Sequence, residues 1–427
     1  VARALPEKAA LVEILRTGPA VLGLNGSEAR SFPARYLALV LPARAADRTT
    51  LVDLGPADEI DQAVTGFLEA AGGEEKTGGS TWSAVRRLHD LVLVPLKDLL
   101  GGVEEVVVSS EEPLSLIPFE IMAGPNGRFP LEDHVFIYLN SAREILYPAL
   151  PAAQADRVMA MGDPDVDLYI EGAGAGMTLP GLDGPEGRFP SPRPYGISDL
   201  NLTRIPGAAR EVQAAAQVWP KGSAEVLLGG EAREDRLWRL SGPLKVLHLA
   251  AWLARPGAGV GWTEDGPDEP SFFSDPFGAI SLALAGANNA LLQSPGPQDG
   301  LLSAEEVLGL DLSGVEIVVL SLRYKNQLTL RQARDLEALD LAFRRAGARA
   351  VVMNLWPVPD QEALEMTRAL HTALAGGEEP VRAFRTALLH LKQAVERRHG
   401  RARPDLWGAW VFRGLESRPT PWPPARD

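Results

Sequence analysis

The stretches EIVVLSLR (316–323) and VLHLAAW (246–252) decide the fold of this chain. Each is an apolar run that ends abruptly in a large side chain, Arg323 in the first and Trp252 in the second. Such runs are typical of strands that are buried on both faces of a parallel sheet, and ligands gather at the carboxyl ends of these strands. We therefore expect Trp252 and Arg323 to lie close together at one edge of a sheet.

Strand-like and helix-like stretches alternate along the chain, which predicts an α/β layer structure. The spacing of apolar residues predicts helices over 6–17, 56–72 and 83–100. A second α/β series begins near residue 157, after a linker. We therefore expect an N-terminal α/β subdomain over 1–150, a second domain over 151–415 and a disordered Pro-rich tail over 416–427.

Composition excludes several classes of protein. The net charge of −14 argues against a nucleic-acid partner, which requires a basic face. No stretch of about 18 apolar residues is present, so we expect no membrane span. The chain has no Cys, which excludes disulfides and thiolate metal sites and fits a cytoplasmic protein. No cluster of His, Asp and Glu has metal-ligand spacing and no Gly-rich phosphate loop follows a strand, so no cofactor is expected.

The two strands and a series of landmarks resemble the CHAT family, caspase-like proteases that are associated with tetratricopeptide repeats. In that family the two strands read HLATHG and LSACETG, and the second His and the Cys form the protease dyad. Further similar segments occur in the same order, namely PLSLIPFEIM (113–122), MGDPD (161–165), Arg210–Glu211, AFRRAGARAVVMNLWPVPD (342–360) and WGAWVFRG (407–414). The resemblance implies a caspase-like, mostly parallel sheet flanked by helices and preceded by a smaller α/β, pseudo-caspase-like half.

The departures from the family pattern are concentrated where the dyad would lie. Trp252 stands at the position of the catalytic His, and Arg323 at that of the Cys. The Gly after the His is Leu253, and the Glu-Thr-Gly after the Cys is replaced by Tyr324, Lys325 and Asn326. A later Gly-Glu-Gly of the family falls on Ala333, Arg334 and Asp335. A thiolate nucleophile requires a Cys, so this pattern indicates a degenerate active site.

Five residues are candidates for lining the degenerate cleft: Arg323, Trp252, His248, Ser321 and Asp335. Trp252 is expected to fill the space where a substrate would lie. Arg323 is expected to pair with a carboxylate, most plausibly Asp335 or else Asp360, or to form a site for an anion or an acidic peptide. His248 is either a core histidine or a replacement base, and Ser321 is a possible replacement nucleophile.

The resemblance thus predicts a catalytically inactive pseudoprotease that binds proteins as a regulatory or scaffolding module in bacterial signalling or defence. Its partner would be a protein, such as an active protease or the substrate of one. Two alternatives remain open at this point. One is a cysteine-independent peptidase that uses Ser321 and His248, and the other is a peptide-binding groove that acts as a substrate trap.

Overall fold

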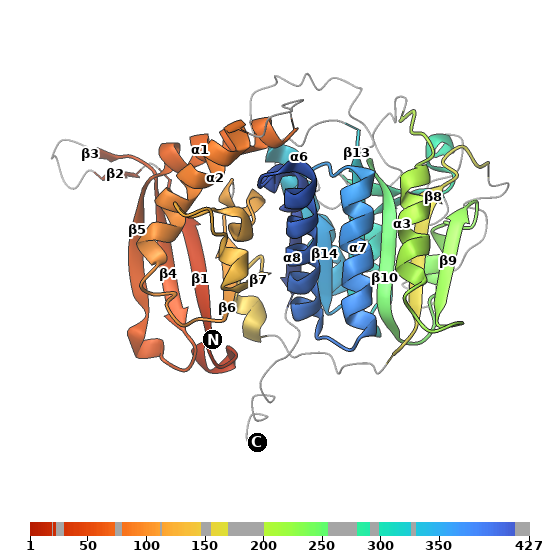
Figure 1. Cartoon of the computed structure of the whole chain (residues 1–427), viewed down its shortest axis with the longest axis horizontal. Helices are drawn as coiled ribbons and strands as arrows, with labels where there is room; N and C mark the ends of the chain where they lie inside the picture. Colours follow the sequence, from red (N-terminus) through yellow and green to blue (C-terminus); the bar gives the residue numbers. More distant parts are fainter. Residues whose placement is uncertain are drawn as a thin grey trace. The chain divides into compact units, whose positions relative to one another are not determined.

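The computed structural model describes residues 1–18, 20–22, 30–72, 79–111, 113–146, 155–169, 200–254, 280–290, 299–325 and 330–414, without the side chains of 20–22, 30–32, 72 and 330–335. The chain forms two compact units (Figure 1). The first unit contains residues 1–151 and 352–427, and the second contains residues 152–351. The expected tail over 416–427 lies outside the described residues.

The first unit contains a mixed sheet in the order β15-β7-β6-β1-β4-β5. Its strands are β1 (Ala9–Arg16), β4 (Arg35–Pro42), β5 (Thr50–Pro56), β6 (Glu105–Ser110), β7 (Val135–Tyr138) and β15 (Trp410–Gly414). The pairs from β15 to β1 are parallel, and β4 and β5 are added antiparallel. A separate hairpin joins β2 (Ala20–Leu22) to β3 (Arg30–Phe32). The helices are α1 (Ala57–Gly72), α2 (Gly79–Leu88), α7 (Asp360–Ala375), α8 (Pro380–His399) and α9 (Pro404–Trp407).

The helix predicted over residues 6–17 is wrong, because this segment contains the strand β1. β1 pairs with β4 on one side and with β6 on the other, so it lies inside the sheet. Its apolar residues from Ala9 to Val12 are consecutive and all buried, a pattern that fits a strand covered on both faces. This segment is therefore a strand, because pairing with β4 and β6 stabilises the extended conformation despite the helical spacing of its apolar residues.

The second unit contains the sheet that the two deciding stretches predict. Its strands are β8 (Val158–Pro164), β9 (Ala224–Gly229), β10 (Leu244–Ala254), β11 (Ser281–Ala283), β12 (Leu301–Ser303) and β13 (Val315–Tyr324). The order β9-β8-β10-β13 is parallel, and β11 and β12 extend the end of β10 antiparallel. The helices are α3 (Pro206–Ala216), α4 (Asp235–Trp238), α5 (Ala304–Leu308) and α6 (Leu330–Arg345). The expected fold class, a mostly parallel sheet flanked by helices, is confirmed.

The two units divide the chain differently from the expected domains 1–150 and 151–415. The chain returns to the first unit within β14 (Ala350–Asn354), so residues 352–414 group with the N-terminal part. Contacts within the first unit account for this grouping. β15 pairs with β7, and the ring of Trp356 packs edge-on against that of Phe67 at 5.2 Å. Sequence continuity alone did not indicate this return.

The helix α3 packs closely on one face of the sheet of the second unit. It contacts β8, β9 and β10, and Figure 1 shows it lying along these strands. Gly162 permits this approach, because a Cβ atom there would lie 2.9 Å from the carbonyl oxygen of Ala208 and from a methyl group of Val212. The side chains of α3 that face the sheet are therefore held against β8 and β10.

A buried carboxyl group in the first unit predicts that stability depends on pH. Glu120 is 1% exposed, and the hydroxyl of Tyr138 donates a hydrogen bond of 2.5 Å to its Oε2. Burial raises the pKa of Glu120 from 4.5 to about 7, although the bond from Tyr138 opposes the rise. The folded state therefore retains a proton that the unfolded chain releases, and stability should fall as the pH rises from about 4.5 through 7.

We expect a loss on the order of 3 kcal/mol across this range, measured as the free energy of unfolding in urea at several pH values. Glu120→Gln should abolish most of this loss, because the amide cannot ionise. Glu69→Gln, at an exposed position, is the matched control and should retain it. The same pH dependence in the Glu120→Gln variant would contradict the assignment.

Candidate functional site

Trp252 and Arg323 lie opposite each other on neighbouring parallel strands. The register of β10 and β13 pairs Ala250 with Ser321 and Trp252 with Arg323. The predicted adjacency of the two strand ends is therefore confirmed. Because side chains alternate along a strand, His248 and Trp252 share one face of the sheet with Ser321 and Arg323. This is the face on which α3 packs.

Glu211 of α3 brings three of these residues together. Nη2 of Arg323 donates a hydrogen bond of 2.8 Å to Oε2 of Glu211, and Nε2 of His248 lies 3.2 Å from Oε1. Nη1 of Arg323 donates a hydrogen bond of 2.9 Å to Oγ of Ser321. Glu211, His248 and Ser321 are fully buried, and Arg323 is 8% exposed. We call these four residues the Glu211 cluster.

Glu211 is held in its ionised form. Burial by itself raises the pKa of this carboxyl group, but the Arg323 cation and hydrogen bonds from His248 and Ser321 outweigh burial and lower the pKa to about 2. The Arg323 guanidinium is therefore neutralised inside the protein. A buried ion pair with further hydrogen bonds is an arrangement that holds two elements together, and here it joins α3 to β13.

Glu211, which pairs with Arg323, was not among the carboxylates predicted, and the predicted pairing with Asp335 stays a prediction. Asp335 was the preferred candidate, but its side chain lies outside the described residues, and Asp360 is the first residue of α7 in the first unit. Glu211 was noted in the sequence only as part of a family landmark. Its position gives a signal that could have identified it, because it lies three residues after Ala208 and one before Val212, on the apolar stripe of α3. An acidic residue on such a stripe requires a buried partner.

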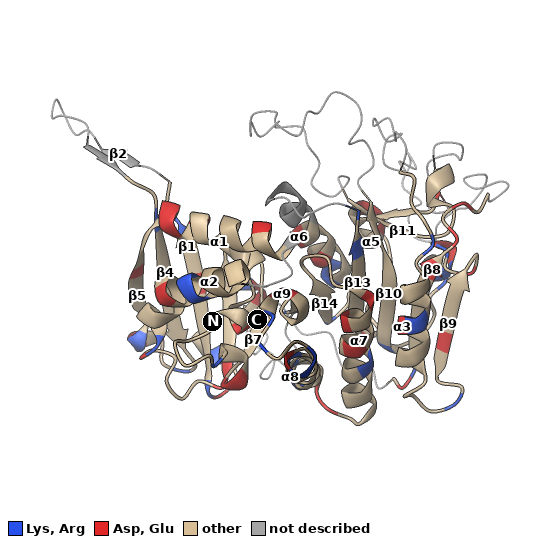
Figure 2. Ribbon diagram, turned by 45° about the horizontal axis from the view of Figure 1, so that its top comes forward, with Lys and Arg blue, Asp and Glu red and all other residues tan. Residues whose placement is uncertain are grey.

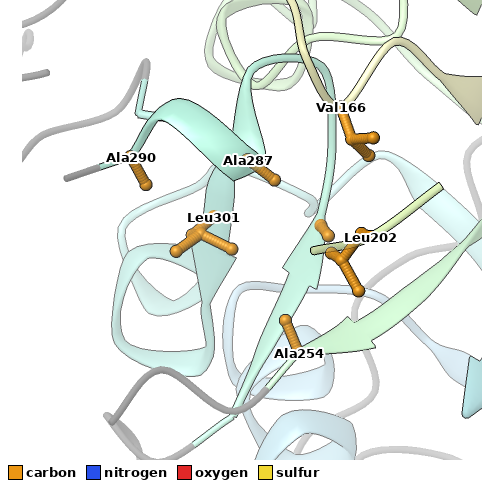
Figure 3. Packing of buried hydrophobic residues seen from close by; sticks show 7 residues of the cluster. Val166, Leu202, Ala254, Ala287, Ala290 and Leu301 are labelled. Atoms are coloured by element: carbon orange, nitrogen blue, oxygen red, sulfur yellow. The ribbon is translucent and has the colours of Figure 1, made fainter. Parts of the chain in front are cut away.

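Trp252 is partly buried, and it joins two groups of apolar side chains. Its ring packs against the cluster around Ala250 and Val212 and also against the cluster around Leu202 and Ala254. Figure 3 shows the side chains of the second cluster. The indole Nε1 donates a hydrogen bond of 2.7 Å to the carbonyl oxygen of Thr203. The indole thus contacts the segment that leads into α3.

The charged side chains of the described residues are spread over both units. Figure 2 shows basic and acidic residues interspersed along the helices and strands of each unit. Among the described residues, no group of three or more His, Asp or Glu side chains is placed to hold a metal ion. Arg323 pairs with Glu211, and a site for an external anion or an acidic peptide at this cation stays a prediction.

The sequence is similar to one protein family and to two mammalian proteins. The CHAT domain family model matches residues 83–414. Tetratricopeptide repeat protein 28 of Homo sapiens is 22% identical over 357 residues, which are 78% of this chain and 13% of that protein. The Mus musculus protein of the same name is 22% identical over 354 residues, with the same coverage. This chain therefore spans a small part of the length of these relatives.

Among solved structures, the Arg-specific cysteine proteinase gingipain R is similar over 84% of this chain and 74% of its own. The sequence identity is 8% and the TM-score is 0.43.

Proposed function

Since this chain belongs to the CHAT domain family, we propose that it is a catalytically inactive member that acts by binding another protein. The observation that carries the proposal is the residue at the position of the family's nucleophile. That position holds Arg323, and the 427 residues include no Cys at all. The guanidinium is permanently protonated, so it can neither attack a peptide carbonyl nor accept the proton of a nucleophile.

The geometry gives no support to a peptidase that uses Ser321 and His248. A nucleophile must reach the substrate carbonyl, and a base must reach the nucleophile. Both side chains are fully buried, and the hydroxyl of Ser321 accepts a hydrogen bond from Arg323. Nε2 of His248 is directed at Glu211. In our proposal these residues stabilise the fold of the second unit.

A regulatory or scaffolding role fits a chain that retains the fold of its family without the catalytic pair. In this proposal the partner is a protein, either an active protease or a substrate of one, and the compartment is the cytoplasm. Within the described residues no helix is long and apolar enough to cross a membrane. The matched relatives are human and mouse proteins, so a role in bacterial signalling or defence stays a prediction from the resemblance.

The purified chain is expected to show no turnover of peptides that contain Arg, Lys or Asp, because it has neither the thiol nor the histidine of the dyad. The measurement is release of a fluorophore from such peptides, with an active cysteine protease of the same fold as the positive control. Ser321→Ala is the matched variant. Turnover that survives repurification and disappears in this variant would replace the proposal with the serine peptidase.

The binding role is tested separately from catalysis. The tagged chain is used to capture proteins from its native host, and each candidate identified by mass spectrometry is then purified and titrated against the chain by calorimetry. A protein that binds intact, without being cut, supports the regulatory or scaffolding role. A candidate that is cleaved during the titration contradicts it.

A further inference from the structure

Residues 200–205, which we call the strap, lie at the carboxyl-terminal edge of β10 and β13. Nζ of Lys325, the residue that follows β13, donates a hydrogen bond of 2.9 Å to the carbonyl oxygen of Leu200. Nε1 of Trp252 binds the carbonyl oxygen of Thr203. Trp252 and Lys325 both occupy positions at which the sequence departs from the family pattern. Two of the departures at the former catalytic edge therefore contact the same short segment.

The main chain of the strap is bound by side chains rather than by a neighbouring strand. The amide side chain of Asn288 accepts a hydrogen bond from the N–H of Leu202 at 3.0 Å and donates one to its carbonyl oxygen at 2.9 Å. The carboxylate of Asp163 accepts a hydrogen bond of 2.5 Å from the N–H of Ile205. Leu202 and Ile205 are the buried residues of the strap, and buried backbone groups require partners. Side chains from β8, from β10 and from the segments after β11 and β13 supply the partners of the strap.

Two side chains of the strap add specific contacts. Leu202 is 5% exposed and enters an apolar cluster that Figure 3 shows around it, formed by Val166, Ala254, Ala283, Ala287, Ala290 and Leu301. Arg204 makes a two-pronged ion pair with Asp163, with distances of 3.0 and 2.6 Å. Asp163 adopts φ of 47° at an irregularity between β8 and β9, a conformation that is uncommon for residues other than glycine. The second unit thus binds the side chains of Leu202 and Arg204 as well as the main chain of the strap.

We propose that the strap is an internal ligand that occupies and closes the carboxyl-terminal edge of the sheet, and that Trp252 and Lys325 are positioning residues that hold it there. An extended peptide from a partner could use the same donors only after displacing the strap. This inference rests on the proposed function, because it treats the carboxyl-terminal edge of β10 and β13 as a binding surface. It holds whether or not the chain has catalytic activity.

The strap is tested by amide hydrogen exchange of Leu202 and Ile205, measured by mass spectrometry on the full chain. Trp252→Phe removes the indole donor and keeps an aromatic ring, and Lys325→Met removes the ammonium donor at an exposed position. Each variant is expected to accelerate exchange of both amides about tenfold, because one anchoring bond is lost. Exchange within β13 is expected to stay at the wild-type rate.

The matched control is Trp238→Phe, because the indole nitrogen of Trp238 is buried without a hydrogen-bond partner among the described residues. This variant should leave exchange of the strap unchanged. Unaltered exchange of Leu202 and Ile205 in both test variants would overturn the proposal. Equal acceleration throughout the second unit would also overturn it, since the two residues would then support the fold in general. Peptidase activity of the chain would refute the proposed function without affecting this result.

Discussion

Arg323→Met is expected to destabilise the chain by about 3–5 kcal/mol at pH 7, because it leaves the Glu211 carboxylate buried without its cation. Glu211 is fully buried, and the Arg323 guanidinium lies 2.8 Å from it. The free energy of unfolding in urea measures the effect. Methionine approximates the length of the arginine stem, so lost packing contributes less than the uncompensated charge.

The pH dependence distinguishes the ion pair from packing. The pKa of Glu211 is lowered from 4.5 to about 2 in the folded state, so its contribution to stability is present above pH 4.5 and is lost as the pH falls toward 2. Without Arg323, burial would instead raise the pKa of Glu211. Protonation of Glu211 at low pH would then remove the unpaired buried charge from the variant. The deficit of the variant should therefore be largest near neutral pH and shrink as the pH falls.

Two further variants serve as controls for Arg323→Met. Arg87→Met removes an exposed ion pair of similar length, 2.7 Å to Glu59, and should cost at most about 1 kcal/mol. The double variant Glu211→Gln with Arg323→Met removes both charges and should recover part of the stability. A deficit for Arg323→Met that equals that of Arg87→Met and does not change with pH would show that the buried pair is unimportant.

Restoring the family's dyad through Trp252→His and Arg323→Cys is expected to yield no peptide cleavage. The new thiol would be buried beside the Glu211 carboxylate, and both burial and the negative charge raise the pKa of a thiol. It would therefore remain protonated and unreactive at neutral pH. The change also removes the indole bond to Thr203, and Leu253 remains where the family has Gly. The measurement is fluorogenic peptide turnover, together with the rate of thiol alkylation.

The single variant Arg323→Cys is the matched control for the double reversion. Both variants are expected to alkylate slowly and to lose about as much stability as Arg323→Met. Specific proteolysis by the double variant alone would mean that the cleft is intact and that only the dyad was lost.

The sequence by itself determined the fold class, the pairing of the two deciding strands and the absence of a thiol nucleophile. Buried apolar runs identify parallel strands, and alternation along them places Trp252 and Arg323 on one face. These properties depend on residues that are close in sequence or on composition, and both can be read directly from the chain.

Only the tertiary structure decided which groups meet at that face. Glu211 is separated from Arg323 by 112 positions, and it reaches the guanidinium because α3 packs tightly over Gly162. The segment 9–16 has helical spacing but becomes β1, because strands on both sides supply its hydrogen bonds and bury both of its faces. Local patterns restrict the face that a side chain occupies, whereas the packing of distant elements selects its partner, and that selection made Arg323 part of a buried ion pair.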